Sequence, residues 1–201
     1  MIGYLKGKIM QKTPVGVLLE NNGVGYEITC STQALSGLTI GAVGEVYTYM
    51  AVREDDISLY GFKSIEEKNM FLKLITVSGI GPKMGITILS QMSLTDLAVK
   101  IATSDVKGLA QVKGLGKKKA EFIIVELREK MGEELKDDNE PKTKKSDQPK
   151  QLDDADSKDA LLALTGLGFS KQESIDVLLR AKEQNVQGVQ ALIAYSLKNI
   201  K

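Results

Sequence analysis

The stretch VKGLGKKKAEFII at residues 112–124 repeats the pattern of VSGIGPKMGITIL at residues 77–89, and the two align without a gap. In each copy an apolar residue precedes Gly-apolar-Gly, and the apolar residues that follow have a helical spacing. The starts at positions 77 and 112 give a period of 35 residues, which is typical of internal structural repeats. The repeat therefore predicts two copies of one helix–loop–helix unit.

Each predicted loop brings two glycines to the start of a helix. Without Cβ atoms, successive backbone N–H groups can converge on one anion, and the helix dipole adds positive charge there. The three lysines after the second loop lie where a cation is unfavourable unless an anion is bound. The pattern thus predicts phosphate binding by Gly79, Gly81, Lys83, Gly114, Gly116, Lys117, Lys118 and Lys119. For either copy alone, a tight turn with solvated lysines is the simpler alternative.

The duplicated loops resemble the helix-hairpin-helix motif, which is found in proteins that bind DNA through its backbone without reading sequence. This resemblance implies that the two loops contact phosphates of both strands across a minor groove. Nucleotide binding, another use of glycine-rich loops, is not supported by the spacing. No G-x-x-x-x-G-K-[ST] motif is present, and neither loop follows a predicted strand.

The charge of the chain is unevenly distributed, although the net charge is only +1. Residues 65–131 carry 11 basic and 7 acidic groups, whereas residues 1–64 and 132–159 are net negative. One basic block indicates a single module that faces a polyanion. The single Cys30 and the absence of histidine disfavour disulfides, metal clusters and most triad chemistry. We expect no cofactor, no metal and no catalytic residue, and a cytoplasmic protein without a secretion signal or membrane span.

The apolar pattern changes along the chain. Residues 1–63 predict five short antiparallel strands, which fit an OB-type barrel better than a sandwich of about seven strands. From residue 64 the period is helical, with Ser64 as N-cap and Glu67 as its capping-box partner. We expect a helix from residue 65, further helices over 82–91, 94–101 and 117–131, and a short turn near 105–110.

The C-terminal third has a different composition. Residues 132–152 contain no aromatic residue and cannot bury enough surface to become ordered. Residues 153–201 leave room for three short amphipathic helices with breaks at GLGF and NVQG. The predicted fold class is multidomain α+β, with an OB-fold barrel (1–63), a tandem helix-hairpin-helix domain (64–131), a flexible charged linker (132–152) and a UBA-like three-helix bundle (153–201).

The stretch VREDDISLYGF contains the densest charge cluster of the predicted barrel, Arg53, Glu54, Asp55 and Asp56. Carboxylates are unexpected in a DNA-binding protein because phosphates repel them. One explanation is a solvated hairpin loop in which Asp56 forms the turn. Another is a metal-dependent nuclease site, although neighbouring carboxylates on an extended strand point in alternate directions and converge poorly on a metal.

The chain resembles the RuvA family over essentially its whole length. The resemblance rests on the start MIGYLKGKI, the GVGYE turn, VREDDISLYGF, the two glycine loops, the charged linker and the small C-terminal domain. It implies a non-catalytic subunit that binds four-way (Holliday) junctions and holds them open and square-planar for branch migration, in recombination and repair of DNA damage. It also implies a homotetramer, alone or as two facing tetramers, with Glu54 and Asp55 as a central acidic pin. Whether Asp56 shares this role is open.

The same resemblance implies two protein partners within the SOS response, the hexameric RuvB ATPase and the RuvC resolvase on the same junction. Leu164, Leu167 and Phe169 in LTGLGF match the region by which the family contacts the ATPase. Leucines at this spacing are also common core residues. The rival functions are a structure-specific nuclease using Glu54, Asp55 and Asp56, and a general duplex-coating protein.

Overall fold

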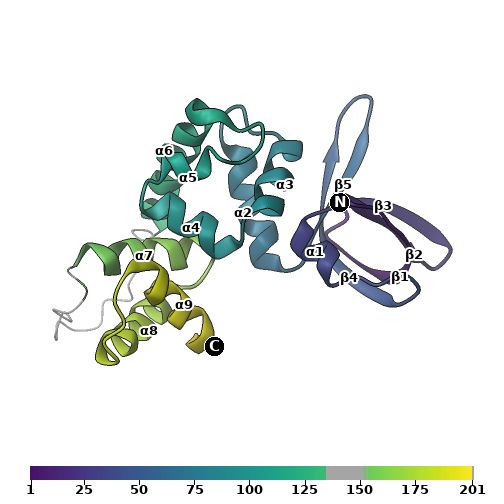
Figure 1. Cartoon of the computed structure of the whole chain (residues 1–201). Helices are drawn as coiled ribbons and strands as arrows, with labels where there is room; N and C mark the ends of the chain where they lie inside the picture. Colours follow the sequence, from purple (N-terminus) through teal and green to yellow (C-terminus); the bar gives the residue numbers. More distant parts are fainter. Residues whose placement is uncertain (135–151, 153, 201) are drawn as a thin grey trace. The chain divides into compact units, whose positions relative to one another are not determined.

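The computed structural model of the chain describes residues 1–134, 152 and 154–200 (Figure 1). These residues form two compact units, Met1–Leu94 with Val112–Leu115, and Thr95–Gln111 with Gly116–Lys201. The four sequence domains remain a prediction, and residues 135–151 and 153 of the expected linker and bundle start lie outside the described residues.

The N-terminal strands close into a barrel with the order β1-β2-β3-β5-β4, and the predicted OB-type barrel is confirmed. The strands are β1 (Tyr4–Lys12), β2 (Gly16–Asn21), β3 (Val24–Cys30), β4 (Val43–Val52) and β5 (Ile57–Phe62). Only β3 and β5 pair in parallel among these neighbours. The long β1 pairs with both β2 and β4 and has an irregular register near Ile9, which helps the sheet to close. Gly7 is required there because a Cβ would collide with the Glu20 carbonyl.

A short helix that the sequence did not predict, α1 (Thr32–Ser36), follows β3. Its N-cap Ser31 accepts a hydrogen bond from the Ala34 N–H, and Ala34 and Leu35 are buried in the barrel core. At its other end, the Lys12 ammonium donates to the carbonyl oxygen of Leu35 at 2.6 Å. A five-residue helix has too few periodic positions to be recognised, and it depends on these tertiary contacts.

The barrel is joined to two helices, α2 (Ile65–Thr76) and α3 (Pro82–Gln91), within the first unit. Phe71 of α2 contacts three aromatic rings of the barrel, with ring centroids 5.3 Å from Tyr49, 5.7 Å from Tyr60 and 4.7 Å from Phe62. On its other side, a Cβ at Gly85 of α3 would lie only 3.0 Å from the Phe71 ring. Barrel, α2 and α3 therefore share one core.

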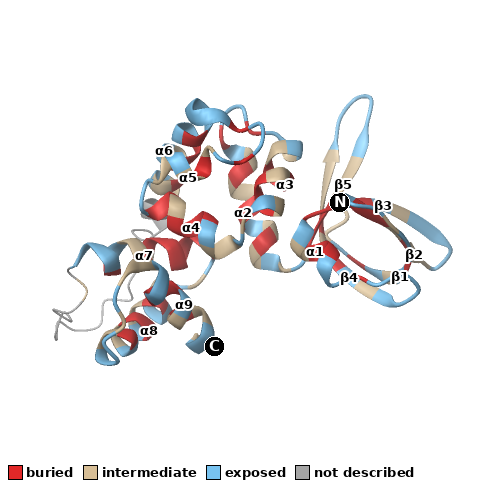
Figure 2. Cartoon of the chain, in the orientation of Figure 1, coloured by how far each residue is buried: buried red, intermediate tan, exposed pale blue. Residues whose placement is uncertain are grey.

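The second unit contains α4 (Leu94–Ala102), α5 (Val106–Leu109), α6 (Gly116–Glu134), α7 (Ala155–Gly166), α8 (Lys171–Glu183) and α9 (Val189–Asn199). The last three helices are those predicted, with breaks at the expected GLGF and NVQG sequences. In α6, α8 and α9, buried residues recur between exposed ones, as an amphipathic pattern requires, whereas Leu162–Gly166 at the end of α7 are all buried (Figure 2). Helix α6 continues to residue 134, three residues into the segment expected to be the linker.

Candidate nucleic-acid interface

The first glycine loop is a tight turn between α2 and α3. Val77 and Ile80 are buried on either side of it, and the Ile80 N–H donates to the Val77 carbonyl at 3.0 Å. Gly79 has φ +79°, a left-handed conformation that side chains disfavour, whereas Gly81 has φ −90°. Gly81 is the N-cap of α3 and offers no side chain to its N–H groups. Pro82, the first residue of α3, has no N–H, and the Met84 N–H donates to the Gly81 carbonyl at 3.0 Å. An external anion would therefore meet the N–H groups of Gly81 and Lys83.

The second loop repeats this geometry, which confirms the duplicated helix–loop–helix unit. Val112 and Leu115 are buried, and the Leu115 N–H donates to the Val112 carbonyl at 3.0 Å, as in the first loop. Gly114 has φ +83°, matching Gly79. Gly116 differs from Gly81, because its φ of +70° also lies in the left-handed region.

The second loop packs against α3, the helix that begins at the first loop. The Lys113 N–H donates to the side-chain oxygen of Gln91, the last residue of α3, at 3.1 Å. A Cβ at Gly114 would lie 3.5 Å from the terminal carbon of Met84, in the first turn of α3. A ligand that contacts the first turn of α3 would therefore meet the second loop beside it.

The lysines around both loops are exposed, and neither α3 nor α6 has an acidic residue in its first turn. The exposed set is Lys83, Lys113, Lys117, Lys118 and Lys119. Lys117 pairs with Glu121 one turn along, at 3.9 Å, and its side chain remains 78% exposed. Such a surface ion pair is weak, so the lysine can turn to a phosphate at little cost.

The acidic cluster forms the tip of the β4–β5 hairpin, which extends past the barrel (Figure 1). Val52 and Ile57 are the outermost residue pair between β4 and β5. Strand β3 pairs with β5 from Leu59 onward, so the end of the hairpin lies beyond this pairing. Asp56 accepts a hydrogen bond from the Ser58 hydroxyl, so its carboxylate helps to form the turn. Glu54 and Asp55 are exposed at the tip. The hairpin thus presents these carboxylates to its surroundings.

Comparison with known proteins places this geometry in a family. The model of the RuvA N terminal domain matches residues 1–61, and that of the SAM-like Helix-hairpin-helix tandem matches residues 71–129. The Holliday junction branch migration complex subunit RuvA of Acetivibrio thermocellus is 37% identical over 204 residues, covering 100% of this chain and 98% of its own length. The chain belongs to the RuvA family. A RuvA subunit of Alkaliphilus oremlandii is 38% identical over 206 residues, with 98% of each chain covered.

RuvA-family membership gives no support to the nuclease alternative, and neither does the hairpin. Within residues 1–134, 152 and 154–200, no group of three or more His, Cys, Asp or Glu side chains is arranged to hold a metal ion. Glu54, Asp55 and Asp56 belong to this part of the chain. In the same part of the chain, no helix has the length and apolar character needed to span a bilayer.

The structure separates the three partner-binding candidates of this RuvA-family chain. Leu164 and Leu167 are buried in the C-terminal bundle, so their side chains act as core. Phe169 is only partly buried. Gly168, directly after the C-cap of α7, has φ +100°, and the Phe169 N–H donates back to the Leu164 carbonyl at 3.2 Å. Of the three, Phe169 alone keeps surface for a partner.

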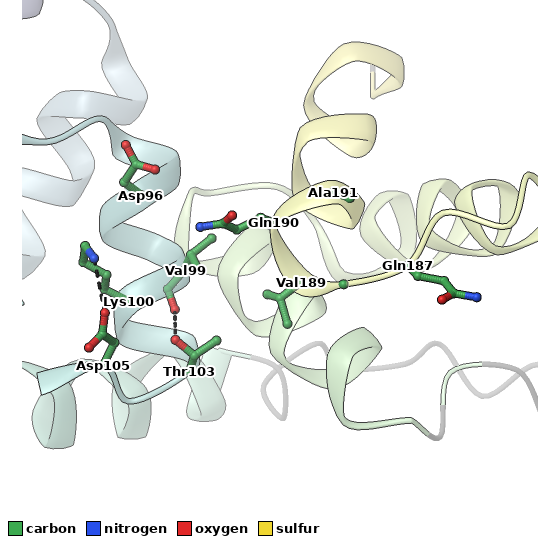
Figure 3. Close-up of a pocket in the computed structure, with 10 residues that line it drawn as sticks. Asp96, Val99, Lys100, Thr103, Asp105, Gln187, Val189, Gln190 and Ala191 are labelled. Atoms are coloured by element: carbon green, nitrogen blue, oxygen red, sulfur yellow. Dashed lines mark hydrogen bonds and ion pairs between the residues drawn. The ribbon is translucent and has the colours of Figure 1, made fainter. Parts of the chain in front are cut away.

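A hollow of about 500 Å³ lies in the second unit between α4 and the start of α9 (Figure 3). On one side Lys100 and Asp105 form an ion pair at 3.2 Å. The pKa of Asp105 is lowered mainly by the hydrogen bond from the Gly108 N–H and, to a smaller extent, by the hydrogen bond from the Lys100 ammonium. Two charged groups of this hollow, Lys100 and Asp105, thus bind each other, and none of the predicted DNA-binding residues lines it.

Proposed function

We propose that this RuvA-family protein binds four-way DNA junctions through the phosphate backbone, holds them open and recruits a hexameric ATPase for branch migration. The observation that carries the proposal is the pair of glycine turns, each starting a helix without an acidic residue in its first turn, with the second turn packed against the helix that follows the first. The relatives of this chain, which are named Holliday junction branch migration complex subunit RuvA, support it.

The two turns suit DNA backbone because each offers N–H groups and lysines without any feature that would read a base. The loop glycines would let the DNA backbone come close to the protein backbone at Gly79, Gly81, Gly114 and Gly116. The exposed lysines would neutralise phosphates, namely Lys83, Lys117, Lys118 and Lys119. Binding through these contacts is independent of sequence and sensitive to salt.

The acidic hairpin would supply the preference for a junction. In a tetramer, Glu54 and Asp55 of four copies would bring eight carboxylates near one axis. Their repulsion of phosphates would keep the crossover from closing, while the basic loops hold the arms. Plain duplex offers no open centre in which such charges can lie, so the hairpin would select against it. The tetramer, or an octamer of two facing tetramers, belongs to this proposal.

The C-terminal bundle would recruit the motor, with the partly exposed Phe169 as a contact. This division assigns ATP hydrolysis to the partner and no catalytic residue to this chain. A RuvC-type resolvase on the same junction and a cytoplasmic location complete the proposal. A chain truncated after residue 140 should bind junctions normally and lose recruitment of the RuvB-type ATPase, as measured by co-sedimentation.

A competition experiment tests the proposal as a whole. Labelled four-way junction is bound to the full chain and displaced by unlabelled junction or by duplex of the same sequence. We expect junction to compete far better, and equal competition would support a general duplex-coating protein instead. The same complexes incubated with Mg²⁺ or Mn²⁺ should stay intact; cleavage lost on replacing Glu54 and Asp55 would establish the nuclease alternative.

A further inference from the structure

A nearly fully buried carboxylate lies where α2 packs against the barrel. Glu67, in the first turn of α2, is 3% exposed, and none of the DNA contacts proposed above uses it. Burying a carboxylate is unfavourable unless hydrogen bonds replace its water. Its position therefore calls for an explanation from its partners.

The partners of Glu67 come from separate segments of the first unit. The Lys63 N–H, in the turn after β5, donates to its carboxylate at 2.6 Å. The Ser31 side chain, between β3 and α1, is hydrogen-bonded to the same carboxylate. Ser31 is itself fixed, because its N–H donates to the Gly61 carbonyl at 3.0 Å and its Oγ accepts the Ala34 N–H at 3.1 Å. Glu67 thus ties α2 to two segments of the barrel.

This arrangement differs from the capping box predicted from sequence. Ser64 does accept the Glu67 N–H at 3.3 Å, as expected. The Glu67 carboxylate, however, accepts a hydrogen bond from the N–H of Lys63, one residue before the N-cap. It is also hydrogen-bonded to the buried side chain of Ser31. A local capping residue has become a tertiary contact.

The orientation of α2 determines where the first glycine loop lies relative to the acidic hairpin. Glu67 and Thr76, the last residue of α2, are nine residues apart, which corresponds to about 14 Å along the helix axis. A tilt of about 10° at Glu67 would therefore move the loop end of α2 by about 2.4 Å. Such a shift is most of a hydrogen-bond distance and would break a phosphate contact.

The aromatic contacts of Phe71 hold α2 on the barrel but constrain its angle less, because apolar burial is not directional. Hydrogen bonds to a buried carboxylate have preferred distances and angles. Burial raises the pKa of Glu67, and the Ser31 and Lys63 hydrogen bonds oppose that shift. A neutral glutamine, which keeps an acceptor, should therefore be able to replace it.

We propose that Glu67 is a positioning residue that fixes the acidic hairpin at residues 53–56 relative to the first glycine loop at residues 78–81. Both can then engage one four-way junction at the same time. The geometric part concerns this chain alone, and its consequence for DNA rests on the proposed function.

Pulsed electron paramagnetic resonance on the full chain tests the geometric part without DNA. Spin labels are attached at Thr39→Cys in the barrel and Ser78→Cys in the first loop, in a Cys30→Ala background. We expect one narrow distance distribution for the parent and for Glu67→Gln, and a broadened or shifted distribution for Glu67→Ala. Glu66→Ala, on the same turn but less buried, and Ile9→Val, in the barrel core, should leave the distribution narrow and so control for charge loss and general destabilisation.

The ratio of junction affinity to duplex affinity is then measured for the same substitutions. Glu67→Ala should lose much of this preference, and Glu67→Gln should restore it. If Glu67→Ala does not fold, Ser31→Ala replaces it, since it removes one partner and keeps the carboxylate. The proposal is overturned if Glu67→Ala, or Ser31→Ala in its place, has the same distance distribution as the parent. It is also overturned if the distribution broadens while the variant prefers junction over duplex as strongly as the parent does. If the parent chain itself shows no junction preference, the proposed function fails, while the distances still decide whether Glu67 sets the geometry.

Discussion

Neutralising two lysines beside the second glycine loop gives the most direct measure of phosphate contact. Lys117 and Lys118 are exposed on the first turn of α6, directly after Gly116. Each can neutralise one phosphate, and each phosphate contact contributes about 0.9 to the slope of log K against log salt for duplex DNA. The double variant Lys117→Gln, Lys118→Gln should therefore have a slope shallower by about 1.8.

The slope change predicts a salt-dependent loss of affinity. Between 200 and 50 mM salt, the ratio of parent to variant affinity should grow by about tenfold. Fluorescence anisotropy with one labelled junction, titrated at four or more salt concentrations, measures this ratio. The loss should be the same for junctions of different sequence, because the contacts are to backbone.

Two control variants separate contact from charge. Lys130 pairs with Glu126 at 3.9 Å, as Lys117 does with Glu121, but lies about 20 Å further along α6. Lys130→Gln should leave the slope unchanged, and so should Lys158→Gln with Lys198→Gln, two exposed lysines of the C-terminal bundle. Equal slopes for the loop variant and the parent would refute phosphate contact at α6, and an equal change in the controls would show that only net charge matters.

Three further outcomes follow from the structure. Gly114→Ala should destabilise the fold by about 1–2 kcal/mol in thermal unfolding because its φ is +83°, whereas Gly81→Ala, at φ −90°, should be close to neutral; similar losses for both would contradict this reasoning. Glu54→Gln with Asp55→Asn should keep or tighten DNA binding but reduce junction preference in competition gels, and a preference as strong as that of the parent would remove the hairpin from the mechanism. Hydrogen bonds from Lys182 and Ser157 lower the pKa of Asp154 to about 2 in the folded chain. The ionised Asp154 therefore stabilises the fold fully at pH values above the pKa of an unfolded aspartate, and this stabilisation is lost as the pH falls through about 2. The stability difference between the parent and Asp154→Asn should accordingly shrink over that acid range in urea titrations, and a difference independent of pH would argue against the ion pair.

Much of the candidate site could be predicted because its signals are local. The glycine spacing, the flanking apolar residues and the basic first turn all lie within a few residues of each other, and both loops have the predicted geometry. The bounds of α3, expected at 82–91, are those observed. Short runs rich in β-branched and aromatic residues, separated by turn signals, were enough to indicate a five-stranded barrel. The expectation that all its strands pair antiparallel was wrong for β3 and β5, which are parallel.

The positions of side chains relative to distant segments could not be predicted in this way. Leu164, Leu167 and Phe169 have similar sequence surroundings, yet packing buries the two leucines and leaves the phenylalanine partly exposed. Helix α1 was missed because its stability comes from the barrel core rather than from its own five residues.

Local sequence was sufficient for the repeated loops, the strands and longer helices, and the separation of basic from acidic segments, since these depend on residues near one another in the chain. Only in the folded chain does the second loop meet Gln91 and Met84 of α3, and only there does the Glu67 side chain leave its own N-cap for Ser31. Such contacts join residues more than twenty positions apart in sequence or compete with an equally good local partner. Which one forms depends on how the whole core packs, and no local pattern contains that information.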